Sequence, residues 1–521
     1  MAERGVVLAV DIGTSATKAV LFDGQGRVLC LARRSYPMLT PQADWAEQDP
    51  ETVYPAVLAA IREAYGARPA GLRVEAISFS SQWYSTMPVD RDGRPLANYL
   101  TWSDRRAADV ADRLRQSGSA QAIYQTTVCP IDAIYPLSKI AWFQQGEVGR
   151  AATRYISIKE YVFHRLFGEY AVDWGMAAAT GLLDIRKAVW DETAVTAAGI
   201  RMEQLSPLVS PRTILTRWNP DALAFTGIPQ GTPCVFGGGD GALASVGVGA
   251  IGKGVAAVNV GTSAAARYLT QTPLTDPRGH LWTYLVDEGW WVVGGIVSSG
   301  AVVYDWFTRA VGPGEPASDA AAPAPQDLHA AINDMAGAVS PGAEGLIFLP
   351  YLSGEQCPVW DPRTTGGFWG LTLRHGRAHL ARAVYEGITM SIVRIVEAIG
   401  QTFEPIEELR VTGGLLGSST WLRIAADMFG ARIHIPETAE GSALGAAVMA
   451  WVALGMASDL RAAKALVRPS TSVEPDPETH RFYQGYSRQA QRILEAVKAV
   501  QGQRSSDTAG RAEMDSHNLT H

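Results

Sequence analysis

The chain has 521 residues, of which 47% are hydrophobic and 19% are charged, a balance that is typical of a large soluble enzyme. Its formal net charge of −7, without a run of Lys or Arg, gives no reason to expect nucleic acid or an anionic membrane as a partner. Four scattered cysteines without a CxxC pair argue against a disulfide framework or a zinc site, and the lack of a signal-peptide pattern or of about 20 consecutive apolar residues favours a cytoplasmic protein.

The first predicted elements are two short strands joined by a turn of small residues. Residues 8–21 read LAVDIGTSATKAVL, with Gly13-Thr14 between the two apolar runs. Such a hairpin exposes backbone N–H groups that can bind an anion such as phosphate. Asp11 ends the first strand, where its carboxylate can hold Mg²⁺ beside a phosphate. The alternative is an ordinary hairpin with a turn-favouring Asp-x-Gly.

Strands and helices then alternate through the first half of the chain. Asp49-Pro50 supplies an N-cap and a first-turn proline for a helix. The predicted helices cover residues 50–65, 103–116, 138–144 and 156–167, and the predicted strands cover residues 6–10, 16–22, 28–33 and 74–80. Residues 205–233, rich in Pro and Thr, are expected to form a connection.

The hairpin recurs in the second half. Residues 256–269 read AAVNVGTSAAARYL and align with the first copy without a gap. The turn is repeated as Gly261-Thr262, but Asn259 stands where the first copy has Asp11. Two similar turns, only one of them with a carboxylate, predict a nucleotide held between two related halves.

The offset between the copies is about half of the chain, which predicts domains at residues 1–251 and 252–500. Strands alternating with helices indicate α/β domains with mainly parallel sheets. In the second domain the predicted strands cover residues 345–350, 408–412 and 432–435, and the predicted helices cover residues 379–401, 418–429 and 442–454. Residues 316–325 are predicted to form a surface loop, and the polar residues 503–521 a disordered tail.

A glycine-rich run at residues 236–241, FGGGDG, ends in a carboxylate. The glycines remove side-chain bulk, so a substrate can approach Asp240 closely. A carboxylate in this place can accept the proton of an alcohol that attacks a phosphoryl group, which is the role of the base in a kinase. The alternative is a glycine-rich turn in which Asp240 caps a helix at residues 242–248.

Two more glycine motifs lie in the second half. Gly413-Gly414 follows a strand and leaves room for a purine or a ribose, although a tight strand–helix turn is the simpler interpretation. Gly441-Ser442 opens a helix of small residues, which favours close helix packing. No GxxxxGK[ST], HExxH or GxSxG motif is present, which excludes the P-loop ATPases and those two classes of hydrolase site.

Taken together, these elements resemble the FGGY carbohydrate kinases, a family within the group of actin-like (ribonuclease H-like) ATPases. The resemblance extends from about Val6 to Leu454. Residues 135–142 (YPLSKIAW) look like the first signature of the family, and residues 413–427 (GGLLGSSTWLRIAAD) look like its second. Several stretches are most similar to the gluconokinase branch, and one of them, residues 349–355 (LPYLSGE), is shared with xylulokinases.

The resemblance implies two actin-like α/β domains with ATP and a sugar in the cleft between them. The implied reaction is transfer of the γ-phosphate of ATP to a sugar hydroxyl, with Asp240 as catalytic base and Asp11 linked to Mg²⁺. The implied nucleotide-binding residues are Gly13, Thr14, Gly261 and Thr262 for the phosphates, and Gly413, Gly414, Gly441 and Ser442 for adenosine.

Two departures from the family pattern concern the substrate. Trp83-Tyr84 stands where this branch and the xylulokinases usually have Met-His, and Ser298-Ser299 replaces a pair of asparagines. Aromatic faces pack on the C–H surface of a sugar while their polar tips bond its hydroxyls. The predicted sugar-pocket residues are therefore Gln82, Trp83, Tyr84 and Trp102, with core packing as the alternative for the aromatic residues.

Charged residues near these motifs are expected to be structural. Lys139 and Lys159 could attract an anionic substrate, but a structural role is favoured for both. Asp104 and Arg105 are predicted to form an ion pair that orients the pocket.

We therefore expect a phosphotransferase that acts on a sugar or sugar acid, with gluconate as the leading acceptor. Xylulose, or another ketose or polyol, is the first alternative. An alternative of another class is a non-catalytic actin-fold regulator that binds nucleotide, against which the presence of both Asp11 and Asp240 argues. The expected partners are small molecules, with no nucleic acid and no membrane, and a homodimer is compatible with the sequence.

Overall fold

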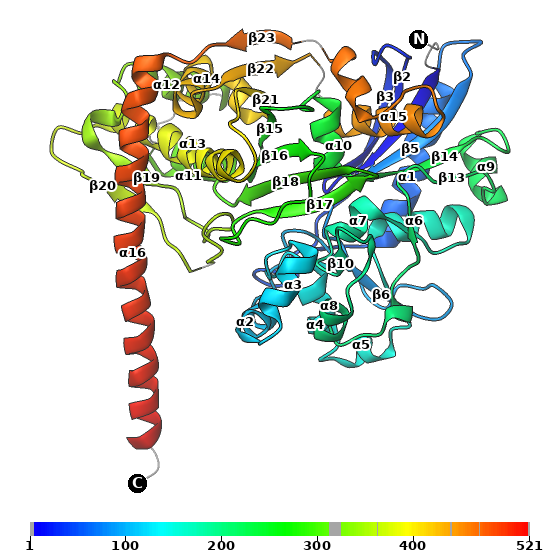
Figure 1. Ribbon diagram of the computed structural model, residues 1–521, viewed down its shortest axis with the longest axis horizontal. Helices are drawn as coiled ribbons and strands as arrows, with labels where there is room; N and C mark the ends of the chain where they lie inside the picture. The colour runs from blue at the N-terminus through cyan, green and yellow to red at the C-terminus, as the bar shows by residue number, and fades with distance from the viewer. Residues whose placement is uncertain (1–4, 312–324, 362, 438–439, 468, 519–521) are drawn as a thin grey trace, which may run out of the picture.

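The two copies of the hairpin organise two separate sheets in the computed structural model, which describes residues 5–311, 325–361, 363–437, 440–467 and 469–518 (Figure 1). The first sheet has six strands in the order β13 (Ile214–Leu215), β14 (Cys234–Gly239), β5 (Val74–Ser81), β1 (Val6–Ile12), β2 (Ala16–Phe22) and β3 (Val28–Ser35). The second has seven in the order β17 (Trp282–Asp287), β18 (Trp290–Val297), β16 (Ala264–Thr270), β15 (Val255–Val260), β21 (Glu408–Gly413), β22 (Arg432–Pro436) and β23 (Pro469–Val473).

The repeat extends from the hairpin to the order of the strands. In the first sheet β1 pairs antiparallel with β2 and β2 with β3, while β1 pairs parallel with β5 and β5 with β14. In the second sheet β15, β16 and β18 make the same antiparallel series, and β15, β21 and β22 the same parallel one. The prediction of mainly parallel sheets is therefore wrong, because each sheet is built outward from a hairpin and is mixed.

Each sheet is covered on one face by a helix from the opposite half of the chain. Helix α15 (Gly441–Ala453) packs on β1 and β5 of the first sheet, and α10 (Asp240–Gly247) packs on β16 of the second. The two helices cross each other between the sheets (Figure 1). A Cβ atom at Gly445 would lie 1.9 Å from the Leu243 carbonyl oxygen, so this crossing needs glycine. The small residues predicted to allow close packing are confirmed in that role.

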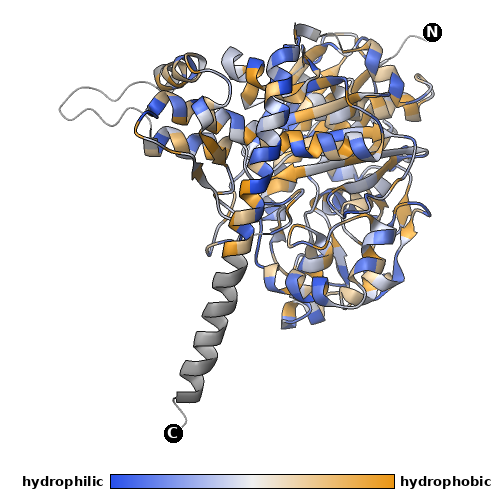
Figure 2. Cartoon of the chain, turned by 60° about the vertical axis from the view of Figure 1, so that its left-hand side comes forward, coloured by the Kyte–Doolittle hydropathy of each residue, from blue (hydrophilic) through white to orange (hydrophobic). Residues whose placement is uncertain are grey.

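The outer faces of the sheets carry the remaining large helices. Helix α1 (Pro50–Gly66) covers the first sheet and begins at the predicted cap, because Asp49 accepts the N–H of Glu51. Helix α13 (Arg377–Thr402) covers the second sheet, with α11 (Ala301–Val311), α12 (Pro325–Gly337) and α14 (Ser419–Phe429) beside it. Figure 2 shows hydrophobic residues concentrated in the strands and in the helices packed on them.

Residues 82–209 add a lobe of short elements below the first sheet (Figure 1). Its helices are α2 (Ala108–Gln116), α3 (Ala120–Thr127), α4 (Pro136–Phe143), α5 (Glu147–Ala151), α6 (Ile158–Phe167), α7 (Trp174–Ala178) and α8 (Glu192–Ala197), whereas α9 (Pro220–Thr226) lies beside the sheet and packs on α1. Its strands are β6 (Met87–Val89), β7 (Tyr99–Leu100), β8 (Arg154–Ile156), β9 (Val172–Asp173), β10 (Leu183–Asp184), β11 (Val189–Trp190) and β12 (Leu208–Val209), and β4 (Glu47–Gln48) pairs with β7.

Two predicted segments differ from the structure. The helix predicted from residue 103 begins at Ala108, after a series of turns, and the connection predicted at 205–233 contains β12, β13 and α9. The last helix is α16 (Pro477–Asn518), and the disordered tail from residue 503 stays a prediction. The predicted loop at 316–325 lies almost wholly outside the described residues. Within the described ranges, no helix has the length and apolar character needed to cross a membrane.

Candidate active site

Side chains from the first half of the chain form hydrogen bonds to the first turn, at Gly13-Thr14 between β1 and β2. Gly13 N–H donates to the Ala16 carbonyl at 3.1 Å, and the Tyr36 hydroxyl donates to the Gly13 carbonyl at 2.6 Å. Gln48 Nε2 donates to the Thr14 carbonyl at 2.8 Å. The turn carbonyls are thus occupied from within the protein, which leaves the side of the turn that carries the Thr14 and Ser15 N–H groups for an anion.

The second turn, at Gly261-Thr262 between β15 and β16, is hydrogen-bonded to the start of α11, the helix that follows β18. Gly261 N–H donates to the Ser263 carbonyl at 2.9 Å, and Ala301 N–H at the start of α11 donates to the Gly261 carbonyl at 2.7 Å. A Cβ atom at Gly300 would lie 2.6 Å from that same carbonyl oxygen, so only glycine lets the helix approach the turn. The two turns therefore share a shape but are fixed by different neighbours.

Asp11 and Asn259 occupy matching positions at the ends of β1 and β15, but their side chains have different partners. Asn259 Nδ2 donates to Thr412 Oγ1 at 2.9 Å. Asp11 Oδ1 is buried and has no hydrogen-bond partner within the described residues. Burial raises the pKa of Asp11 above its ordinary value, and Lys18 on β2 acts in the opposite direction. The Ser80 side chain also lowers the pKa of Asp11, but no described group donates to Oδ1 with the geometry of a hydrogen bond. A buried carboxylate oxygen in this state fits a divalent cation.

Lys18, whose direction the sequence left open, points toward the second half of the chain. Its Nζ forms a 2.8 Å ion pair with Glu440, the residue before α15. The hairpin that carries Asp11 is thereby joined to the helix that covers its sheet. Among the described residues, no group of three or more His, Cys, Asp or Glu side chains could hold a metal ion, so a cation at Asp11 needs further ligands from phosphate or water.

Asp240 lies where β14 ends and α10 begins. Its Oδ1 accepts the N–H of Gly241 at 2.7 Å. Burial and the charge of Asp11 raise the pKa of Asp240 to about 6, although Arg267 acts in the opposite direction. A carboxylate with a pKa near the working pH can both take up and release a proton, which suits a general base.

Two adjoining hollows meet at Asp240. One has a volume of about 140 Å³ and is lined by the aromatic residues Trp83, Tyr84 and Trp102. The other has a volume of about 160 Å³ and extends toward Thr412 and Ser442. Both are also lined by Asn259 and Arg267. The structure thus brings three of the four predicted sugar-pocket residues to the predicted base.

Trp83 and Tyr84 form a fixed wall of the first hollow. The Trp83 indole N–H donates to the Gly175 carbonyl at 3.0 Å, and the Tyr84 hydroxyl lies 3.1 Å from that of Tyr284. Tyr84 has a φ of 65°, a left-handed backbone conformation that costs energy for a bulky residue and is found mostly at functional sites. Trp83 and Tyr84 line the hollow, and both are almost wholly buried. Each residue therefore lines the pocket and packs in the core at the same time.

The glycines before Asp240 make room for protein atoms. A Cβ atom at Gly239 would lie 1.6 Å from Trp83 Nε1, and one at Gly241 would lie 2.3 Å from the same indole ring. Gly237 has a φ of 70° and lies against the Phe79 carbonyl of the neighbouring strand. The glycines therefore let the indole pack directly against the segment that carries Asp240.

Gln82 does not line either hollow. Its side chain is buried beneath the first turn, where Oε1 accepts from the Thr14 hydroxyl at 3.3 Å and Nε2 lies 3.3 Å from the Tyr99 hydroxyl. Trp102 Nε1 donates to Thr14 Oγ1 at 3.1 Å. The residue predicted to bond the sugar thus supports the turn, and Trp102 touches both the turn and the first hollow.

The charged residues beside these motifs are structural, with one change of partner. Lys139 donates to the carbonyls of Tyr84 and Thr101 at 2.9 and 2.7 Å, and Lys159 pairs with Asp173 at 2.6 Å. The predicted Asp104–Arg105 ion pair is wrong. Asp104 pairs with Arg106 at 2.8 Å and Arg105 with Asp132 at 3.5 Å, because the turns at 101–107 rotate successive side chains apart.

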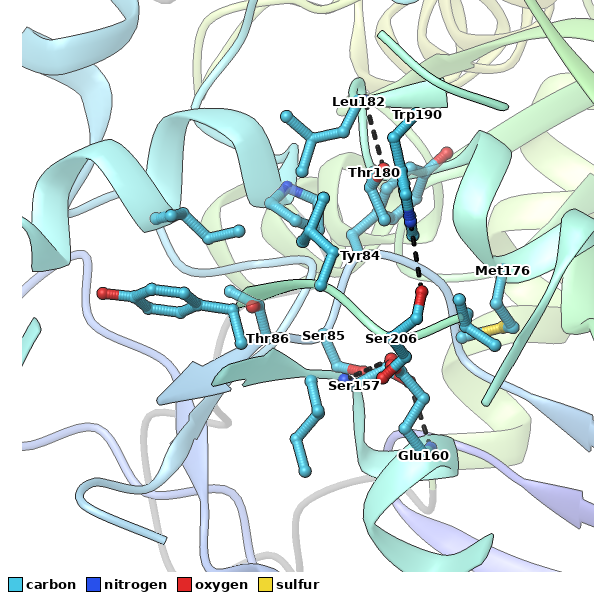
Figure 3. Close-up of a pocket in the computed structure, with 16 residues that line it drawn as sticks. Tyr84, Ser85, Thr86, Ser157, Glu160, Met176, Thr180, Leu182, Trp190 and Ser206 are labelled. Carbon is cyan, nitrogen blue, oxygen red and sulfur yellow. Dashed lines mark hydrogen bonds between the residues drawn. The ribbon is translucent and has the colours of Figure 1, made fainter. Parts of the chain in front are cut away.

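Another hollow is lined by Tyr84 but not by Asp240 (Figure 3). Ser85, Ser157 and Glu160 project toward it, and Glu160 accepts the N–H of Ser157 at 2.7 Å. Its volume of about 20 Å³ has room for a single water molecule. This hollow is therefore too small for a sugar.

The glycines predicted to contact adenosine separate into two places. Gly414 lines a hollow of about 290 Å³ with Ser418 and the rings of Tyr304, Tyr385 and Trp421. Tyr385 and Trp421 are stacked at 4.8 Å. Ser442 lines the hollow beside Asp240 instead, and Gly441 packs on α10.

Sequence reasoning missed Arg267 and Tyr304. Arg267 was visible as the single charged residue of the second hairpin copy, at the position of Ala19 in the first. Nothing in the sequence around Tyr304 sets it apart from an ordinary core aromatic.

Comparisons with known proteins agree with this geometry. Residues 6–247 match the model of the N-terminal domain of the FGGY family of carbohydrate kinases, and residues 256–454 match that of its C-terminal domain. The gluconokinase of Bacillus subtilis is 36% identical over 86% of this chain and 88% of its own, and the xylulose kinase of the same species is 26% identical over 92% and 94%. Among solved structures, the gluconate kinase from Lactobacillus acidophilus superposes with a TM-score of 0.89 at 31% identity, covering 96% of this chain and 99% of its own.

Proposed function

Because the chain belongs to the FGGY family of carbohydrate kinases, which transfer phosphate from ATP to an alcohol group, we propose that its acceptor is gluconate and that Asp240 is its catalytic base. The observation that carries the assignment of the base is the position of Asp240 between an aromatic hollow and the two phosphate turns. The choice of gluconate is supported by the two gluconokinases at 35–36% identity.

The proposed acceptor lies against Trp83, Tyr84 and Trp102 with one hydroxyl at Asp240. Asp240 accepts the proton of that hydroxyl as the oxygen attacks the phosphoryl group, and most of the remaining catalysis is positioning and charge neutralisation. The backbone N–H groups beside Gly13-Thr14 and Gly261-Thr262 bind phosphate oxygens.

Asp11 is the proposed protein ligand of Mg²⁺, a role that its unpartnered buried oxygen supports. Mg²⁺, when bound, neutralises phosphate charge. The aromatic hollow at Gly414 is the proposed site of the base of ATP, since stacked rings flanked by glycine suit a flat heterocycle. The proposed division of the chain near residue 251 is supported by the gap between the two matched ranges.

A second acceptor class, the ketoses, is supported by the xylulose kinases among the relatives. Trp83-Tyr84 departs from the Met-His that is usual in both branches, so it leaves the choice between them open. ADP release should be measured with gluconate, D-xylulose, L-ribulose, glycerol and erythritol. We expect the highest kcat/KM with gluconate and little ADP release with ATP alone. A higher kcat/KM with D-xylulose would replace gluconate as the acceptor.

A further inference from the structure

One cation faces the aromatic hollow with a hydrogen-bond donor that no described protein group accepts. Arg267 lies on β16, and its Nε is buried without a hydrogen-bond partner among the described residues. It is also the only Lys, Arg or His among the described residues that line the two hollows at Asp240. Asp240 supplies a nearby negative charge, but the Nε donor has no acceptor, and a buried donor without an acceptor is costly. An anionic group of a ligand is therefore expected to complete the site.

The position of Arg267 is fixed by its neighbours. Its guanidinium carbon lies 5.9 Å from the centre of a Trp83 ring, within the range of a cation–π contact. A Cβ atom at Gly241 would lie 2.7 Å from Arg267 Nε, so the glycine after the catalytic base leaves the space that the guanidinium fills. The cation is therefore held at one wall of the acceptor hollow.

Arg267 and Ser263 of the second turn both line the first hollow. Three residues of β16 lie between them, so their Cα atoms are about 13 Å apart along the strand. The lysines that could otherwise meet an anionic acceptor are engaged, Lys139 by carbonyls and Lys159 by Asp173. Arg267 is thus the cation that remains beside Asp240 and the aromatic wall.

We propose that Arg267 binds the carboxylate of a sugar-acid acceptor and so selects sugar acids over neutral sugars, an inference that rests on the kinase function proposed above. A planar guanidinium can donate two parallel hydrogen bonds to a carboxylate. The contact places the charged end of the acceptor at β16 and leaves a hydroxyl of its other end for Asp240. The acceptor class follows, because a neutral sugar offers the guanidinium no charged hydrogen-bond acceptor.

The test compares D-gluconate with two neutral analogues, D-gluconamide and sorbitol, which keep the hydroxyl chain but lack the charge. Steady-state kinetics and calorimetric binding should be measured for the wild type and for Arg267→Lys and Arg267→Met. Arg410→Met is the matched control, since Arg410 lies two strands away on the same sheet and lines neither hollow. Circular dichroism and ADP affinity verify that each variant is folded.

We expect the wild type to prefer gluconate to gluconamide at least 30-fold in kcat/KM, mainly through KM. Arg267→Met should lose at least 30-fold with gluconate and less than 5-fold with the neutral analogues, with Arg267→Lys between them and Arg410→Met unchanged in preference. An equal loss with all three acceptors, or weakened binding of ADP, would instead assign Arg267 to the phosphoryl group and overturn the proposal while gluconate turnover stands. Failure of the wild type to use gluconate, with turnover of D-xylulose, would overturn the acceptor assignment itself.

Discussion

The indole Nε1 of Trp102 donates a 3.1 Å hydrogen bond to Thr14 Oγ1, which joins the aromatic hollow to the first phosphate turn. Thr14 in turn donates to Gln82 at 3.3 Å, and its carbonyl accepts from Gln48 at 2.8 Å. A side chain that touches the acceptor hollow is therefore part of the network that shapes the turn. A change in the position of Trp102 is therefore expected to change the conformation of the turn at Thr14.

Replacement of Trp102 by Phe tests this link, because it keeps a ring and removes the N–H donor. A hydrogen bond of this kind contributes about 1 kcal/mol, or roughly fivefold in affinity. We expect the KM values for ATP and for the acceptor both to rise about fivefold in steady-state kinetics. Trp142→Phe is the control, since Trp142 packs on Trp45 outside the hollow. A rise confined to the acceptor KM would show that the wall and the turn act independently.

Asp240→Asn should abolish transfer while leaving ATP binding largely intact. The amide cannot accept the hydroxyl proton, so we expect kcat to fall at least 1000-fold with an ATP affinity within threefold of the wild type. The folded-state pKa of about 6 lies above the ordinary 3.8, so the charged carboxylate destabilises the folded protein at pH 7. The variant should therefore melt roughly 1–3 °C higher. Near-normal turnover would remove Asp240 from the role of base.

The same pKa sets the pH dependence of the reaction. The base must be deprotonated to accept a proton, so kcat/KM should fall about tenfold per unit as pH decreases below about 6 and level off above it. Initial rates between pH 5 and 8 at saturating Mg²⁺ measure the profile. ADP affinity over the same range is the control and should not follow this midpoint. A profile that stays flat down to pH 5 contradicts the raised pKa.

Asp11→Asn tests the proposed metal ligand. An amide oxygen is a weaker ligand for Mg²⁺ than a carboxylate, so the Mg²⁺ concentration for half-maximal rate should rise at least tenfold. The KM for the acceptor at saturating Mg²⁺ should change less than threefold, because Asp11 lines neither hollow. Titrations of rate against Mg²⁺ and Mn²⁺ provide the measurement. An unchanged Mg²⁺ requirement would show that Asp11 is not a ligand of the metal.

The sequence predicted the architecture at the level of local signals. The duplicated hairpin, the cap at Asp49 and the glycine run before Asp240 all lie where expected, because each is determined by residues close together in the chain. The mixed pairing of the sheets was not predicted. Alternation of strands and helices does not show that β2–β3 and β16–β18 extend each hairpin by antiparallel neighbours.

The contacts of individual side chains were harder to predict from the sequence. Gln82 and Trp83 are adjacent in sequence, yet one supports a turn and the other lies beneath Asp240, because the chain turns after β5. Arg267 was missed because a lone charge on an apolar strand gives no direction until the packing of α10 is known. Such contacts join residues from different elements, as between Trp83 and Gly239, and local sequence does not specify them.

The crossing of α10 and α15 offers a test of how packing supports the site. A Cβ atom at Gly445 would lie 1.9 Å from the Leu243 carbonyl oxygen, and that backbone cannot move without shifting the helix that begins at Asp240. Gly445→Ala should lower the free energy of unfolding by about 1–3 kcal/mol and reduce kcat as Asp240 is displaced. Urea denaturation and initial rates measure the two effects.

Gly400→Ala is the matched control for this substitution. Gly400 lies inside α13, and a Cβ atom there would meet only Pro405 Cα at 3.8 Å, an ordinary contact. Alanine favours a helix over glycine by about 0.5–1 kcal/mol, so this variant should be slightly more stable than the wild type. Equal stability changes in the two variants would mean that helix propensity, not the close approach of α10 and α15, determines the effect. We expect the free energy of unfolding to fall in Gly445→Ala and to rise in Gly400→Ala, with activity lost only in Gly445→Ala. Of these two glycines, only Gly445 lies where α10 and α15 cross.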